Sequence, residues 1–179
     1  RERERGREMV TNENREEYVR AYVKWILDVS VSQQFEAFAK GFNKVCGGIA
    51  FDLFEPQELE LLVCGSPELN LKDLKHGTKY EDGYTSESRV IADFWKVVMR
   101  FDEEEKKLFL KFVSGSDRSP IDGLSHMGFI ISKNGTEDTR LPSAHTCFNH
   151  LLLPEYSSVE VLERKLKMAI HQSEGFGLR

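Results

Sequence analysis

The residues best suited to chemistry lie in one stretch, Leu141 to Asn149, where a cysteine follows a histidine by two positions. Pro142 lacks a backbone donor and biases the residue before it toward an extended conformation. In an extended segment, side chains two positions apart share a face, so His145 and Cys147 would point the same way. A thiol beside an imidazole is a possible nucleophile with a possible proton acceptor.

A structural cysteine is the alternative interpretation of Cys147. Free cysteines are among the most buried residues and usually behave as small hydrophobic side chains. An unperturbed thiol is ionised to only about 3% at pH 7, and a nearby imidazole would raise the reactive thiolate fraction. The local pattern alone therefore leaves both a nucleophile and a core residue open.

Composition narrows the class of protein. The 179 residues are 40% hydrophobic and carry a net charge of −5, which suits one ordinary domain or two small lobes. No single-sign charge block indicates a nucleic-acid partner, and no apolar run indicates a signal peptide or a membrane partner. Three cysteines without Cys-x-x-Cys spacing argue against disulfides and zinc. We therefore expect a protein without a metal ion or a cofactor. We also expect it in a reducing compartment, which is the cytoplasm and could include the nucleus.

Helical periodicity dominates the first third of the chain. Asn14 with Glu17 resembles a capping box for a first helix, and a second helix is predicted to end at Gly47. A third helix is predicted over residues 51–65, with Pro56 in its first turn. The aromatic stripe of the second helix and two nearby thiols are predicted to be buried: Phe35, Phe38, Phe42, Val45, Cys46 and Cys64.

Three longer helices are predicted in the rest of the chain. Their expected starts are Thr85 or Ser86, then Asp102 with glutamates in the first turn, and finally a capping box of Ser157 with Glu160. Helical spacing indicates the apolar side chains that face inward: Val90, Phe94, Val97, Phe101, Leu108, Phe109, Phe112, Val161, Leu162, Leu166, Ala169 and Ile170. The stem of Lys165 is expected to lie along the same side of the last helix.

Short strands complete the expected fold. Residues 129–133 read as a strand ended by the Asn134-Gly135 turn, and residues 151–153 read as another. Residues 77–88 are predicted as a polar loop and residues 136–140 as a mobile one. Helices with a few short strands predict an α+β fold, with a helical first part and a small α/β carboxy-terminal part.

The cysteine stretch and its surroundings resemble the carboxy-terminal lobe of HECT-type ubiquitin-protein ligases. That family carries a Leu-Pro-x-x-His-Thr-Cys-Phe-Asn loop, a Leu-x-Leu-Pro-x-Tyr segment, one helix and a Gly-Phe-Gly-like tail. Here the same order is found in residues 141–149, residues 151–156, a helix from about Ser158, and residues 175–177. Two earlier runs, residues 11–19 and 58–66, resemble the last helices of the family's amino-terminal lobe.

The resemblance implies two parts. Residues 1–70 would be the last helices of an incomplete amino-terminal lobe, and residues 71–179 would form the carboxy-terminal lobe, with a hinge near residues 66–75. Nothing in the sequence resembles the part of the first lobe that docks the conjugating enzyme. We therefore expect an acceptor cysteine without its docking surface, and early helices that expose apolar surface.

The resemblance also implies a transferase that works through a thioester. Cys147 would receive ubiquitin from a ubiquitin-conjugating enzyme and pass it to a lysine of a protein substrate, marking that substrate for degradation. Lysine is almost entirely protonated at pH 7, so a proton acceptor is needed, and His145 is the local candidate.

Five further residues are carried over in supporting roles. Thr146 and Asn149 would hydrogen-bond the loop or the thioester carbonyl, with structural capping as the alternative. Arg118, in a Gly-x-x-Arg-x-Pro loop like the family's, would orient the cysteine loop, and an exposed arginine is the alternative. Phe148 belongs to the loop itself, and Phe176 would anchor the tail during transfer or rest on its own lobe.

Two other functions remain open from the sequence. The chain could be a non-catalytic ubiquitin-binding fragment, because the docking part is not recognisable. It could also be a cysteine hydrolase, although such an enzyme needs a base placed by a third residue, and no oxyanion-hole motif is visible.

Overall fold

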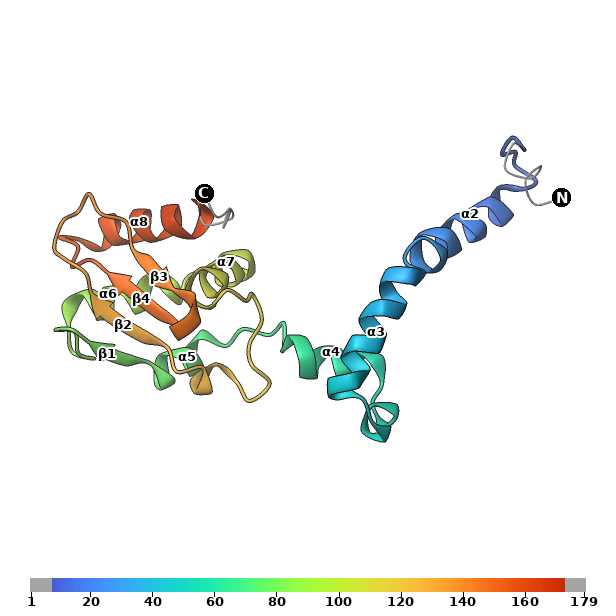
Figure 1. Cartoon of the computed structure of the whole chain (residues 1–179). Coiled ribbons are helices and arrows are strands. Elements are labelled where there is room, and N and C mark those ends of the chain that lie inside the picture. The colour runs from blue at the N-terminus through green and yellow to red at the C-terminus, as the bar shows by residue number, and fades with distance from the viewer. Residues whose placement is uncertain (1–7, 173–179) are drawn as a thin grey trace. The chain divides into compact units, whose positions relative to one another are not determined.

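The structure is a computed structural model in which residues 8–172 are described. It divides into two compact units at residue 55, a helical first unit and a second unit that contains the sheet (Figure 1). By its contacts, the helix over residues 56–64 belongs to the second unit. The assignment of residues 1–70 and 71–179 to two family lobes stays a prediction. No helix among residues 8–172 is both long enough and apolar enough to cross a membrane.

The first unit is a succession of helices. They are α2 (Arg15–Lys24), the π-helical η1 (Trp25–Val29), α3 (Ser32–Cys46) and the short 3-10 helix η2 (Ile49–Leu53). The predicted end of the second helix at Gly47 is confirmed. The predicted helix over residues 51–65 is interrupted, because α4 (Pro56–Cys64) begins anew at its proline, the position where a missing backbone donor does least harm.

The predicted capping box at Asn14 is not formed. Asn14 does precede α2, but its side chain makes no hydrogen bond to the helix. Its Oδ1 instead accepts from the backbone N–H of Thr11 at 2.7 Å, and its Nδ2 donates to the carbonyl of Met9 at 3.1 Å. The asparagine therefore folds the preceding turn and leaves the helix start without a side-chain cap.

The aromatic stripe of α3 is exposed, so its predicted burial was wrong. Phe35 and Phe38 are 64% and 66% exposed, and none of the described side chains between residues 8 and 55 is buried. Cys46 and Cys64 are exposed as well. A helix stripe is buried only when a second layer covers it, and the described helices of this unit do not supply one. The expectation of exposed apolar surface on these helices is confirmed.

The second unit alternates helices with short strands, which confirms the α+β fold. After α4 its elements are α5 (Leu71–Gly77), β1 (Lys79–Glu81), α6 (Arg89–Val98), α7 (Glu103–Ser114), η3 (Leu124–His126), β2 (Ile130–Lys133), β3 (Ser143–His145), η4 (Thr146–Phe148), β4 (His150–Leu153) and α8 (Val159–Gln172).

The four strands form one sheet in the order β1-β2-β4-β3 (Figure 1). Strand β2 pairs in parallel with β1 and β4, and β3 pairs antiparallel with β4. The strands predicted near residues 129–133 and 151–153 are confirmed. Strand β1 lies in the segment predicted as loop, because three residues with charged ends carry almost no strand signal, and pairing with β2 stabilises it.

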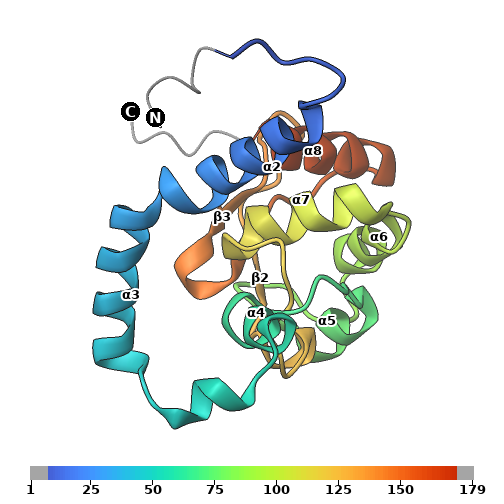
Figure 2. The same ribbon diagram turned by 90° about the vertical axis from the view of Figure 1, so that its right-hand side faces the viewer.

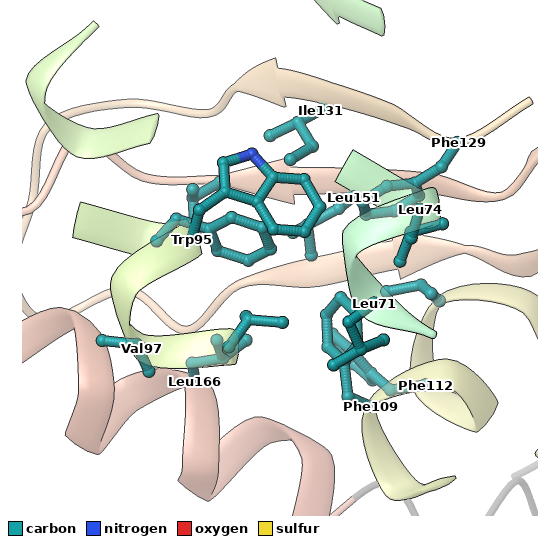
Figure 3. Packing of buried hydrophobic residues seen from close by; sticks show 14 of the residues in the cluster. Leu71, Leu74, Trp95, Val97, Phe109, Phe112, Phe129, Ile131, Leu151 and Leu166 are labelled. Carbon is teal, nitrogen blue, oxygen red and sulfur yellow. The ribbon is translucent and has the colours of Figure 1, made fainter. Parts of the chain in front are cut away.

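One face of this sheet packs against helices. Ile131, Leu151 and Leu153 are fully buried on that face, and Figure 3 shows the first two in one apolar cluster with Trp95 and Phe109. Helix α8 lies beside α6 and α7 and closes this layer (Figure 2). The apolar inward-facing residues predicted for these helices are buried except Leu108 and Val161, which are partly buried against the core.

The helix starts follow sequence chemistry unevenly. Asp102 forms the expected cap of α7, since its carboxylate accepts from the N–H of Glu105 at 2.8 Å and the Glu105 carboxylate accepts in return. Helix α6 begins two or three residues later than predicted, with Ser88 and not Thr85 or Ser86 in the cap position. The predicted capping box at Ser157 is wrong, because Ser158 takes the cap position and accepts from the N–H of Val161 at 3.3 Å.

The loop over residues 136–140, predicted to be mobile, is held from several sides. The Asp138 carboxylate accepts from the backbone N–H of Ser157 at 2.9 Å and from the hydroxyl of the same residue. Tyr156 donates its hydroxyl to the carbonyl of Arg140 at 2.8 Å. These hydrogen bonds from Ser157 hold the pKa of the Asp138 carboxyl below its usual range. The loop that leads to β3 is thus anchored next to the start of α8.

Candidate functional site

The cysteine lies in a tight turn between two paired strands. We call residues 146–149 the cysteine turn; they link β3 to β4, and the strand residues on either side, His145 and His150, are opposite each other in the pairing. The first three residues of the turn form the 3-10 helix η4. Cys147 is exposed, which overturns its interpretation as a core residue.

The shared face predicted for His145 and Cys147 is not found. That prediction required an extended segment through both residues, but strand β3 ends at His145 and the chain turns at once into η4. Strand alternation therefore ends before the thiol. The two residues are separated only by Thr146, and the geometry of the turn, not the pleat of a strand, determines the directions of their side chains.

Asn149 holds the last position of the cysteine turn. Its φ of 49° lies in the left-handed region, which asparagine tolerates better than most residues. Its side-chain Nδ2 donates to the carbonyl of Met127 at 2.7 Å, and its own carbonyl accepts from the N–H of Ile130 at 3.0 Å. The structural alternative for Asn149 thus has direct support, because the side chain fixes the turn to the segment before β2.

Thr146 and Phe148 occupy different environments within the turn. Thr146 is partly buried, and its carbonyl accepts from the N–H of Asn149 at 3.3 Å, which closes the turn on itself. Phe148 is 72% exposed although it is one of the largest apolar side chains of this unit. An exposed phenylalanine next to an exposed thiol offers an apolar contact surface beside the sulfur.

Arg118 was predicted to orient the cysteine turn, which would require a contact with that turn. Its side-chain hydrogen bonds instead go to the end of α4. Its guanidinium donates to the Glu60 carboxylate at 2.7 Å and to the carbonyl of Gly65 at 3.2 Å. Ser66 and Ser119 exchange backbone hydrogen bonds of 2.8 and 2.9 Å beside it. The arginine therefore fastens the segment that enters the unit, an interaction that links residues more than fifty positions apart.

A groove lies between this fastening and the cysteine turn. Its volume is about 560 Å³, and its walls are the end of α4, the loop over residues 114–122, Met127 and Asn149. Ile121, on its wall, is 65% exposed. Sequence reasoning missed the groove, because its walls come from four separate segments whose meeting depends on the tertiary fold.

Two residues near the turn were also missed, His150 and Ser132. The Nε2 of His150 lies 2.8 Å from the hydroxyl of Ser132, and the ring of His150 lies 6.0 Å from that of His145, centroid to centroid. Ser132 is fully buried, and the two rings are inclined by 56°. The signal available in the sequence was the position of His150 directly after the cysteine turn.

Two other expectations concern a metal site and the carboxy-terminal tail. Within residues 8–172, no group of three or more histidine, cysteine or acidic side chains is arranged to hold a metal ion. Phe176 lies outside the described residues, so its predicted anchoring role stays a prediction.

The geometry defines an α+β domain whose exposed thiol lies in the turn that joins two antiparallel strands of a helix-backed sheet. A family model described as HECT-domain (ubiquitin-transferase) matches residues 3–179. The chain belongs to this HECT-domain family, which confirms the resemblance found in the sequence.

Individual relatives agree with the family assignment. Over 169 residues the chain is 49% identical to a Mus musculus protein named "Probable E3 ubiquitin-protein ligase HECTD2" and 44% identical to a Homo sapiens protein named "Probable E3 ubiquitin-protein ligase HERC4". Over 175 residues it is 41% identical to "E3 ubiquitin-protein ligase RSP5" of Chaetomium thermophilum. Each match covers 94% of this chain but 22%, 16% and 21% of the relative, so the chain spans about a fifth of their length.

Proposed function

We propose that this chain is the thiol-bearing part of a HECT-type ubiquitin ligase and that Cys147 carries ubiquitin as a thioester. The observation that supports the proposal is the exposed cysteine in a turn fixed at both ends, in a chain that matches the ubiquitin-transferase family over nearly its full length. The partners are ubiquitin, a ubiquitin-conjugating enzyme and a protein substrate, in the cytoplasm or nucleus, and substrates are marked for degradation.

The first chemical step is an exchange of thioesters. The thiolate of Cys147 attacks the carbonyl carbon at the carboxyl end of ubiquitin, the new C–S bond forms, and the thiolate of the conjugating enzyme leaves. A thioester is a reactive acyl donor, so the step needs no complete catalytic triad. Exposure of Cys147 is the structural requirement, since a whole protein must approach it.

The second step forms an amide. A substrate lysine loses a proton, attacks the thioester carbonyl and expels the Cys147 thiolate. His145 is exposed at the entrance to the turn and takes up the lysine proton in this scheme. Asn149 and Thr146 keep the turn in shape through their hydrogen bonds, and Phe148 contributes an apolar contact for incoming ubiquitin.

A charging assay tests the proposal. The chain is mixed with ubiquitin, activating enzyme and a panel of conjugating enzymes, once alone and once preceded by the amino-terminal part of a relative's HECT domain. We expect an adduct that reducing agents remove, formed at least in the longer protein and absent after Cys147→Ala. Cys64→Ala is the matched control, because that thiol is also exposed but lies at the end of α4.

Each other outcome has a defined meaning. An adduct that survives Cys147→Ala, or no adduct in either protein, contradicts the proposal. Ubiquitin binding without an adduct would instead identify a non-catalytic binding fragment. Release of ubiquitin from ester or amide bonds by the chain alone would identify a hydrolase.

A further inference from the structure

Three polar side chains form a row across one face of the sheet. Strand pairing places Ile130 of β2 opposite His150 of β4, and His150 opposite His145 of β3. Ser132 follows Ile130 by two positions, and residues two apart in a strand share a face. The strands thus present Ser132, His150 and His145 on the same side, in that order across the sheet.

This row is on the face opposite the helices. Their neighbours along β2 and β4, Ile131 and Leu151, are fully buried and cluster with side chains of α6 and α7, among them Trp95 and Phe109 (Figure 3). Alternation turns the row away from that core. Burial falls along it, from Ser132, which is fully buried, through His150, which is partly buried, to His145, which is exposed.

The contacts connect the buried end of the row to the exposed end. The 2.8 Å hydrogen bond between the Ser132 hydroxyl and Nε2 fixes the His150 ring to the central strand. The His150 ring then lies 6.0 Å from the His145 ring, within the range at which aromatic rings contact each other. His145 and His150 are also the pair that closes the cysteine turn.

We propose that His150 is a positioning residue for the chemistry of Cys147: anchored by Ser132, its ring holds the exposed His145 ring at the entrance to the cysteine turn. The proposal rests on the proposed function and adds a residue to it. An exposed histidine samples several rotamers, and restricting it beforehand removes that entropy from the reaction. A displacement of about 1 Å in a reacting group can reduce a rate by two orders of magnitude.

The first test observes His145 without any ubiquitin. Nuclear magnetic resonance of the imidazole ring signals compares the 179-residue chain with Ser132→Ala, which removes only the anchoring hydroxyl. Ser143→Ala is the matched control, because it removes a hydroxyl from the same sheet face, next to Leu152 instead of His150. We expect the signals of His145 to shift or average in Ser132→Ala and to stay in place in Ser143→Ala. Unchanged His145 signals in Ser132→Ala would overturn the proposal.

The second test asks whether the effect reaches the thiol through His145. Alkylation by iodoacetamide is followed residue by residue with mass spectrometry, and the exposed Cys46 and Cys64 serve as references in the same chain. We expect Ser132→Ala and His150→Ala to slow alkylation of Cys147, relative to Cys64, by roughly threefold or more.

Double variants distinguish positioning of His145 from a general destabilisation of the cysteine turn. In a His145→Ala background, His150→Ala should cause no further slowing, because its effect is exerted through the missing ring. Equal slowing with and without His145 would overturn the proposal, as would an unchanged ratio in both single variants. Ser132→Ala is the mildest change, so it decides the question if His150→Ala fails to fold. Neither measurement uses ubiquitin. Failure of the proposed function would be seen in a different experiment, as the absence of a ubiquitin adduct on the unsubstituted protein in the charging assay.

Discussion

The two compact units are built from similar helices and differ in what those helices face. Helix α3 of the first unit carries an aromatic stripe that is exposed, whereas α6 and α7 of the second unit bury theirs between the sheet and α8. Phe38 is 66% exposed and Phe109 is fully buried, although both recur at helical spacing among apolar neighbours. Periodicity indicates which side of a helix is apolar, but that side is buried only where a second layer of structure packs against it.

The largest effect expected from this difference concerns independent folding. Residues 56–179 contain the sheet and the buried cluster, so we expect them alone to unfold in one cooperative transition. Residues 1–55 bury none of the described side chains, and short helices are marginal in water without packing. We expect that peptide to lose most of its helix at low concentration. Circular dichroism during heating measures both, and a cooperative transition in residues 1–55 would contradict the comparison.

A matched pair of substitutions sharpens the comparison within one chain. Phe109→Ala removes a ring from the core and should lower the free energy of unfolding by about 3–5 kcal/mol. Phe38→Ala makes the same change on an exposed stripe and should alter it by about 0.5 kcal/mol or less. Urea denaturation measures both. Similar losses would mean that the stripe of α3 is covered in solution.

A smaller contrast concerns the helix starts. Asp102→Ala removes the carboxylate of a complete capping box and should destabilise the second unit by about 1 kcal/mol. Asn14→Ala removes a side chain that makes no hydrogen bond to its helix, so we expect a change of about 0.5 kcal/mol or less. Urea midpoints of the two variants give the comparison, and an equal cost at both sites would show that the cap itself is unimportant.

The smallest expected effect is a dependence on pH in the loop before β3. The pKa of Asp138 is lowered in the folded chain, chiefly because the Ser157 hydroxyl and N–H donate to its carboxylate. The stabilisation is therefore present above the pKa of the unfolded state, about 3.9, and is lost as the pH falls through the lower, folded value. We expect Asp138→Asn to show a shallower loss of stability on acidification, measured by urea midpoints at successive pH values.

The partner of Asp138 offers a control without a change of charge. Ser157→Ala removes one of the two donors, so the pKa of Asp138, followed by nuclear magnetic resonance, should rise toward its ordinary value. Ser143→Ala should leave it in place. An unmoved pKa in Ser157→Ala would show that the hydroxyl does not stabilise this carboxylate.

Much of the second unit could be predicted from the sequence. Asp102 was identified correctly because a capping box is a local arrangement of four residues, and the buried faces of α7 and α8 followed from spacing. Strand β1 was missed because its stability comes from pairing with β2 some fifty residues later. The burial predicted for the aromatic stripe of α3 was wrong because periodicity does not show whether another layer of structure covers the stripe.

The site shows the same division between local and distant information. Cys147 was singled out by a local motif, but its exposure and the turn around it were not predicted. Arg118 bonds to Glu60 and Gly65, which no local pattern indicates. The alternation argument for His145 failed at a single residue, where the strand ends. The contact between Ser132 and His150 depends on the register of two parallel strands, which periodicity does not specify.

Helix α8 completes the core and comes after the cysteine turn in the sequence. Its buried residues Leu162, Leu166 and Ile170 therefore leave the ribosome later than Cys147 does. A domain folds as a unit once its core is available, so a nascent chain that has reached the thiol still lacks the helix that supports the sheet beneath it. Translation that stalls between the two yields a polypeptide whose cysteine turn lies on an incomplete core, and the second unit can complete its fold only after α8 has been synthesised.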